Sequence, residues 1–191
     1  RRERPTSEAQ LAALLRSAGA AQQLAANLLL SHQAEALFQD SSSYLGTRLA
    51  VEQLVGSVAA EWPARRRLRV LEISAGASRV VQHVLAGFPE ERLDYVIAHP
   101  DEAMRARLQL EYSRRLSVRV ANLKPETLEL TADAPLPETY DVIVLRHWLH
   151  RTPHPVGVLA AARRKLALGG LLVVAERHPD LAADFVAGLD P

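Results

Sequence analysis

The sequence contains no cysteine among its 191 residues, and only 5% of the residues are aromatic. Without cysteine, disulfides and thiolate metal sites are excluded, and a reducing cytoplasm is the expected location. The scarcity of aromatic rings disfavours base-stacking surfaces, and a net charge of +1 creates no field that would attract nucleic acid or a membrane. No apolar run approaches the roughly 18 residues that a transmembrane helix requires. We therefore expect a cytoplasmic protein that binds neither nucleic acid nor a membrane.

The chain begins at Arg1, without an initiator methionine or a signal-peptide pattern, and we interpret it as a piece of a longer polypeptide. Hydrophobic residues make up 48% of the sequence and charged residues 24%, which is typical of a globular domain. The length is sufficient for one domain with a hydrophobic core and an appended segment.

The first third of the sequence has a helical pattern. Ser7 and Gln10 form a capping box, and leucines follow it at helical spacing. We therefore assign residues 1–63 to a helical N-terminal segment. Within it, the predicted helices include residues 22–38 and 49–61, and a predicted loop covers residues 40–43.

The pattern changes after residue 63, where short apolar runs alternate with helical stretches. Continuous apolar strands separated by helices predict a parallel, doubly wound sheet. We assign residues 64–191 to a Rossmann-like α/β core with a parallel sheet of about five strands. The predicted strands cover residues 68–73, 94–98, 117–121, 140–145 and 171–175, and the predicted helices cover residues 78–86, 100–115 and 156–168.

Three stretches of this core carry a family resemblance, namely residues 148–153 (WLHRTP), 162–176 and 184–189. Together with the turn at residues 71–78, they resemble the C-methyltransferase domains of modular type I polyketide synthases, within the class I S-adenosylmethionine-dependent methyltransferases. The resemblance covers residues 66–191. It implies S-adenosylmethionine as cofactor, and an acyl carrier protein and neighbouring synthase domains as partners. Sheets of this family normally have seven strands, so this chain either omits two strands or comes from a shortened domain.

The resemblance places the cofactor loop at residues 71–78, which read LEISAGAS. The family has an acidic residue followed by three alternating glycines, which let the backbone approach the cofactor. Here Glu72 holds the acidic position, and Ser74, Gly76 and Ser78 hold the glycine positions. Ser74 adds a side chain where the family has none, whereas Ser78 suits the N-cap of the following helix.

In this family a carboxylate normally follows the second strand, where it accepts hydrogen bonds from the ribose hydroxyls. Here the strand ends in His99, and the nearest carboxylate, Asp101, is expected on the first turn of the next helix, where it stabilises the helix dipole. Substitution of either residue for the missing acid is the alternative. Asn122 follows the third strand, where the family has an aspartate near the adenine amino group.

His150 and Glu176 match the positions of a catalytic His–Glu pair in the family that this chain resembles. The histidine follows the fourth predicted strand and the glutamate ends the fifth, so neighbouring parallel strands bring them to one edge of the sheet. Histidine is a suitable general base for the α-proton of a β-ketoacyl thioester, and a carboxylate on its other nitrogen fixes the tautomer. A structural histidine and a capping glutamate are the alternative. No metal is predicted at His147, His150 and His154, because metal ligands converge and usually include a carboxylate.

Three functions follow from these residues. The leading one is a methyltransferase-like domain with a degenerate cofactor site, which serves as a non-catalytic structural part of a synthase. Each lost charge-assisted hydrogen bond costs about 1.5–3 kcal/mol, so we expect cofactor binding to be weakened by about a hundredfold or more. The first alternative is an active C-methyltransferase that acts on the α-carbon of a carrier-bound β-ketoacyl thioester. The second is cofactor-free acid–base chemistry by His150 and Glu176.

Overall fold

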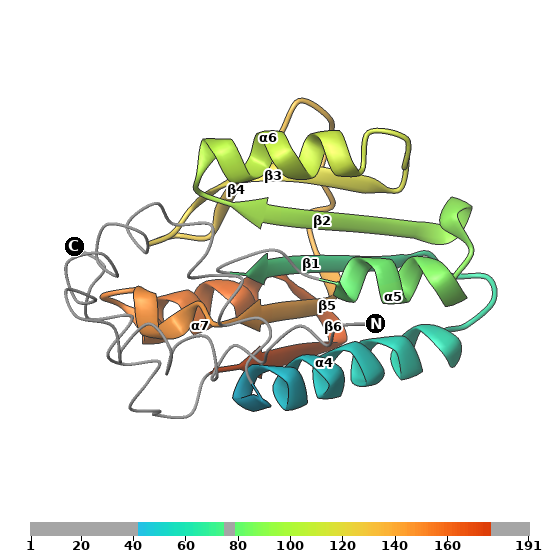
Figure 1. Cartoon of the computed structure of the whole chain (residues 1–191), viewed down its shortest axis with the longest axis horizontal. Coiled ribbons are helices and arrows are strands. Elements are labelled where there is room, and N and C mark those ends of the chain that lie inside the picture. Colours follow the sequence, from blue (N-terminus) through green and yellow to red (C-terminus); the bar gives the residue numbers. More distant parts are fainter. Residues whose placement is uncertain (1–41, 75–78, 177–191) are drawn as a thin grey trace, which may run out of the picture. The chain divides into compact units, whose positions relative to one another are not determined.

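The computed structural model describes residues 42–74 and 79–176, and residues 50–176 form one compact unit (Figure 1). The expected boundary at residue 63 between a helical segment and the core stays a prediction. Several other sequence predictions lie outside the described residues and concern residues 1–41, Gly76, Ser78 and residues 184–189.

A six-stranded sheet with the strand order β4-β3-β2-β1-β5-β6 forms the centre of this unit (Figure 1). The strands are β1 (Leu68–Ser74), β2 (Leu93–His99), β3 (Val118–Lys124), β4 (Glu129–Thr131), β5 (Tyr140–Arg146) and β6 (Leu166–Ala175). Neighbouring strands are parallel, except that the short β4 pairs antiparallel with β3. The predicted Rossmann-like α/β fold is confirmed, and β4 is a strand that the sequence pattern does not predict.

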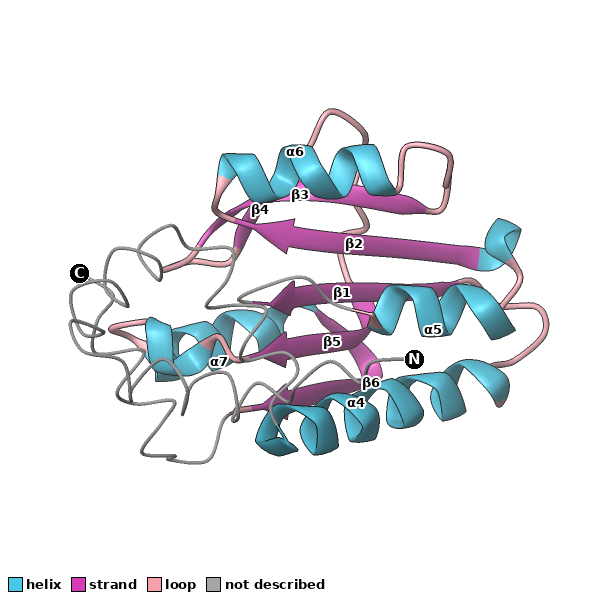
Figure 2. Cartoon of the chain, in the orientation of Figure 1, coloured by secondary structure: helices cyan, strands magenta, loops and turns pink. Residues whose placement is uncertain are grey.

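Helices alternate with these strands along the chain (Figure 2). They are α4 (Ser42–Ala60), α5 (Val80–Gly87), α6 (Glu102–Glu111) and α7 (Pro155–Lys165), with short 3-10 turns η1 (Glu90–Arg92) and η2 (Leu149–Arg151). The second half of α4 packs with α5 and α6 against one face of the sheet, around Val70 and Tyr95. On the other face, α7 packs around Ile143, and Leu128 from the turn between β3 and β4 joins this second cluster. None of the described helices combines the length and the apolar character that crossing a membrane requires.

Three element boundaries differ from the sequence prediction. The described part of α4 already includes Ser42 and Ser43, which the sequence pattern assigns to a loop, because serine costs little in a helix. The helix α6 ends at Glu111, because residues 113–115 offer no apolar side chain to pack onto the sheet. The strand β3 continues to Lys124 because it pairs with β4, and Asn122 therefore lies inside the strand and not after it.

The sequence pattern predicts that Gly169 and Gly170 end a helix. In the structure they lie inside β6 instead. The helix ends at Lys165, and the strand register shifts between the pairs that Tyr140 and Val142 make with β6. Gly169 has a φ of 75°, and a Cβ on Gly170 would lie 2.9 Å from a backbone oxygen. Glycine inside a strand marks such irregularities, because only glycine tolerates the positive φ and the close backbone approach. The pair therefore forms a bulge within the first half of β6.

Candidate active site

The chain changes direction across the sheet at β1, because β2 and β3 lie on one side of this strand and β5 and β6 on the other. In open α/β sheets, ligands bind at such a switch point, outside the carboxyl ends of the strands. The crevice between β1 and β5 is therefore the expected cofactor site. Ser74 and Arg146 end these two strands and lie opposite each other in the register.

Glu72 is fully buried on β1, in the strand that leads to the cofactor loop. Its Oε2 accepts a hydrogen bond of 2.6 Å from the hydroxyl of Tyr95, while its buried Oε1 has no hydrogen-bond partner among the described residues. Burial and the charge of Glu72 raise the pKa of the Tyr95 hydroxyl, while the nearby charge of Arg146 acts in the opposite sense. Tyr95 therefore stays protonated and donates to the carboxylate. The free Oε1 atom is an acceptor that a ligand or a water molecule can use.

Ser74 and Arg146 form a buried bridge between the carboxyl ends of β1 and β5. The guanidinium donates to Ser74 Oγ from Nε at 3.2 Å and from Nη2 at 3.0 Å. Ser74 is only 3% exposed and Arg146 only 4%. Sequence analysis missed Arg146, although an arginine that ends the apolar strand YDVIVLR is a visible signal. Ser74 therefore does not simply crowd the cofactor loop: it is a partner of a buried cation.

The carboxyl end of β2 carries no available carboxylate. His99 is 9% exposed, and its Nδ1 accepts a hydrogen bond of 3.0 Å from the backbone N–H of Asp101. The carboxylate of Asp101 accepts a hydrogen bond of 2.7 Å from the backbone N–H of Met104, so it caps α6. Asn122 lies beside His99 in the strand register, and its side chain has no hydrogen bond within the described part of the chain. The expected helix-stabilising role of Asp101 is therefore the one that its contacts support.

His150 and Glu176 are brought into contact, as their positions after neighbouring strands predict. His150 Nδ1 lies 2.5 Å from Glu176 Oε2, and the two side chains are 32% and 27% exposed. The other carboxylate oxygen, Oε1, accepts hydrogen bonds from the backbone N–H groups of Trp148 and Leu149 at 3.0 and 2.8 Å. A carboxylate only accepts, so Nδ1 is the donor in this contact, and in the neutral imidazole Nε2 then keeps the lone pair. This is the tautomer that a general base with Nε2 as the accepting atom requires.

The backbone at His147 turns the chain from β5 into η2 and so positions His150. His147 has a φ of 53°, a left-handed conformation that histidine adopts more readily than most residues. Its backbone N–H donates to the carbonyl of Ala175 at 2.8 Å, which ties this turn to the end of β6. Among residues 42–74 and 79–176, no three His, Asp or Glu side chains gather in a group that could hold a metal ion.

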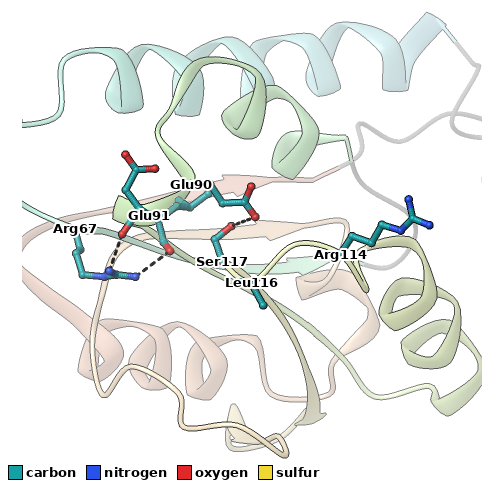
Figure 3. Close-up of a pocket in the computed structure, with 7 residues that line it drawn as sticks. Arg67, Glu90, Glu91, Arg114, Leu116 and Ser117 are labelled. Atoms are coloured by element: carbon teal, nitrogen blue, oxygen red, sulfur yellow. Dashed lines mark hydrogen bonds between the residues drawn. The ribbon is translucent and has the colours of Figure 1, made fainter.

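A pocket of about 340 Å³ opens elsewhere, near the amino ends of β2 and β3 (Figure 3). Arg67 donates there to the carbonyls of Glu91 and Leu93, and Ser117 donates to Glu90 (Figure 3). Ligands of this fold bind at the carboxyl ends of the strands. This pocket lies at the amino ends, and therefore at the opposite edge of the sheet from the candidate site.

The described residues fit S-adenosylmethionine poorly. The unpaired oxygen of Glu72 suits a ligand with a hydrogen-bond donor. However, the guanidinium of Arg146 is bonded to Ser74 between the ends of β1 and β5. At the end of β2, His99 has no carboxylate and the carboxylate of Asp101 is engaged in capping α6, so neither offers one to ribose hydroxyls. His150 and Glu176 are thus in contact, whereas the described residues at the ends of β1, β2 and β5 offer no unengaged carboxylate for ribose hydroxyls.

Comparisons with known proteins agree with this fold. Residues 71–172 match the family described as "Methyltransferase domain". The chain is 29% identical over 174 residues to Highly reducing polyketide synthase 2 of Gibberella zeae, and the match covers 84% of the chain but 7% of that protein.

Two solved structures share the fold. The CurJ carbon methyltransferase has a TM-score of 0.70 and 24% identity, over 84% of this chain and 42% of that one. The trans-methyltransferase CalH, solved in complex with SAH, has a TM-score of 0.60 and 23% identity, over 87% of this chain and 46% of that one. The chain thus spans less than half the length of each of these proteins. The predicted resemblance to polyketide synthase methyltransferase domains is confirmed. Because the family match covers more than half of the chain, the chain belongs to the methyltransferase-domain family.

Proposed function

We propose that this chain is a methyltransferase-type domain of a cytoplasmic polyketide synthase, in which the S-adenosylmethionine site is degenerate and the domain has a structural role. Its partners are then the neighbouring synthase domains and the acyl carrier protein. The observation that carries the proposal is the carboxyl end of β2, where the side chain of His99 stands and the carboxylate of Asp101 is engaged in capping α6. A donor bound there would leave its ribose hydroxyls without the acceptor that they need, at a cost of about 1.5–3 kcal/mol.

Calorimetric titration of the chain with S-adenosylmethionine tests this proposal. We expect no binding at micromolar concentrations, and a dissociation constant near one micromolar would contradict the degenerate site. His99→Asp places a carboxylate at the end of β2 and should tighten binding by about tenfold, because one charged hydrogen bond is regained. His154→Asp, at an exposed position before α7, adds the same charge away from β2 and should change nothing.

Proton transfer without a methyl donor is a second candidate, and the contact of 2.5 Å between His150 and Glu176 favours it. In this reaction His150 Nε2 takes the α-proton of a β-ketoacyl thioester and returns it, so no other reactant is consumed. Exchange of the α-proton for deuterium, followed by mass spectrometry on a β-ketoacyl carrier mimic, measures this activity. This second candidate predicts exchange above the buffer rate in the unaltered chain and in His154→Gln, but not in His150→Gln, whereas the structural role predicts none in any of them.

The same substrate mimic also distinguishes the active methyltransferase. If addition of S-adenosylmethionine adds the mass of one methyl group, and His150→Gln abolishes that gain, the structural role is wrong. If neither exchange nor methylation occurs, the structural role alone is left.

A further inference from the structure

A bridge joins the last residues of β1 and β5 at the switch point, where ligands of open α/β sheets bind. Ser74 and Arg146 face each other in the strand register, and side chains two residues apart on a strand share one face of the sheet. Two hydrogen bonds, of 3.2 and 3.0 Å, fix the guanidinium on Ser74 Oγ. Both residues are at least nine-tenths buried, so the bridge is part of the packed interior and not a mobile surface contact.

The bridge also carries a permanent positive charge into the crevice. A guanidinium does not lose its proton in a protein, and a buried charge is weakly screened by solvent. S-adenosylmethionine contains a sulfonium cation, whereas S-adenosylhomocysteine differs from it by one methyl group and lacks that charge. Arg146 therefore opposes the methyl donor in two ways, by the space that it fills and by its charge.

We propose that Arg146, held by Ser74, is the residue that excludes S-adenosylmethionine from this site and makes its residual preference favour uncharged nucleosides over the sulfonium. The proposal deepens the degenerate site proposed above and rests on it. It also gives a physical role to the serine in the first glycine position of the loop: Ser74 supplies the acceptor for the guanidinium, which a glycine at this position would not do.

Calorimetric titration of Arg146 variants with S-adenosylmethionine and with S-adenosylhomocysteine tests the proposal. Arg146→Ser removes both the bulk and the charge, and should tighten the binding of both nucleosides by at least about tenfold. Arg146→Met keeps most of the length but not the charge, and should improve the binding of S-adenosylmethionine more than that of S-adenosylhomocysteine. Arg119→Ser, which removes a partly buried arginine from Asp94 on β2, is the matched control and should change neither affinity.

The variants must remain folded for these titrations, and their thermal unfolding shows whether they do. If the Arg146 variants unfold, Ser74→Gly removes the acceptor of two hydrogen bonds of the guanidinium while keeping the arginine, and should still tighten binding by a measurable factor. Unchanged affinity in a folded Arg146→Ser, or in Ser74→Gly when the Arg146 variants unfold, overturns the proposal. Equal gains for both nucleosides in Arg146→Met overturn its charge component.

These outcomes are distinct from those of the degenerate-site proposal. Micromolar binding of the donor to the unaltered chain contradicts the degenerate site, whatever the variants do. The role of Arg146 depends only on the difference between each variant and the unaltered chain.

Discussion

At the scale of single residues, the carboxylate of Glu176 makes three contacts in the candidate site. One of its oxygens lies against His150, and the other accepts from the backbone N–H groups of Trp148 and Leu149. The carboxylate thus both caps the turn that carries the histidine and selects its tautomer. A structural role and a catalytic role for this residue are therefore not exclusive, and a substitution must separate them.

Replacing Glu176 by glutamine separates these two roles. The amide keeps an oxygen for the backbone donors but presents an N–H group to His150, so stability should fall by only about 0.5–1.5 kcal/mol while the histidine proton moves from Nδ1 to Nε2. Nitrogen NMR of the imidazole measures the tautomer, with His154 as an internal reference that should not change. A histidine that keeps its proton on Nδ1 in this variant would show that Glu176 does not set the tautomer.

Asp141 predicts how stability depends on pH. Its carboxylate accepts hydrogen bonds of 2.9–3.1 Å from Arg66 and from the backbone and side chain of Arg69. Burial, the largest influence on this carboxyl, raises its pKa, but the hydrogen bonds and charges of Arg69 and the charge of Arg66 outweigh it and leave the pKa below its usual value. The stabilisation is therefore complete above the unfolded pKa of about 3.9 and is lost as the pH falls through the lower folded value.

The variant Asp141→Asn should be less stable than the unaltered chain by about 1–3 kcal/mol at neutral pH, and should lose less stability on acidification. Urea unfolding between about pH 7 and about pH 3 measures both effects. Asp133→Asn, at an exposed position, should keep the acid dependence of the unaltered chain. An equally steep acid dependence in Asp141→Asn would show that other carboxyl groups cause it.

At the scale of the elements, the β6 bulge decides where α7 ends and how the last described strand pairs. Gly170 lies close to the backbone oxygens of Ala167 and Tyr140, at 2.9 and 3.1 Å from the position of a Cβ. The carboxyl half of β6 carries Ala175, which accepts from His147, and leads into Glu176. The bulge therefore sets the register in which the candidate catalytic pair meets.

Gly170→Ala should lower the free energy of unfolding by about 1–3 kcal/mol, because the added methyl group must displace backbone atoms. Gly87→Ala is the matched control: a Cβ there has no neighbour within 4 Å, so this variant should be neutral or more stable by up to about 1 kcal/mol. Urea unfolding of both variants gives the comparison. Equal stability of the two variants would mean that the bulge relaxes around a side chain.

At the scale of the whole unit formed by residues 50–176, β1 is tied to β5 at both ends. Arg69 bonds Asp141 at the amino ends of these strands, and Arg146 bonds Ser74 at their carboxyl ends. The sheet is thus secured at the switch point without a ligand. In contrast, β6 lies at the edge of the described sheet and exposes apolar side chains, namely Leu168, Leu171 and Val174.

The proposed degenerate donor site predicts that S-adenosylmethionine does not stabilise the folded chain, whose sheet is secured without a ligand. A ligand present at about 1,000 times its dissociation constant adds about 4 kcal/mol, which raises the unfolding midpoint of a domain of this size by several degrees. We expect no such increase at about 1 mM donor, measured by thermal unfolding. A rise of several degrees would instead indicate a dissociation constant near one micromolar.

Local patterns were sufficient to predict most of the fold and part of the site. The apolar runs of β1, β2 and β5 identify buried parallel strands, because a strand that is buried on both faces is apolar throughout. The contact between His150 and Glu176 also follows from the sequence, since each comes after a strand and those strands are neighbours. Their roles in catalysis stay predictions.

Only the tertiary structure determines which groups meet across strands. Arg146 reaches Ser74, and the glycine pair of β6 forms a bulge, because residues distant in sequence approach each other there. The strand β4 was missed because its turn has no glycine and relies on Leu128, which has a φ of 52° and a fully buried side chain. The sequence by itself thus determined the fold and the contact between His150 and Glu176, while long-range packing decided that a buried arginine joins the carboxyl ends of β1 and β5.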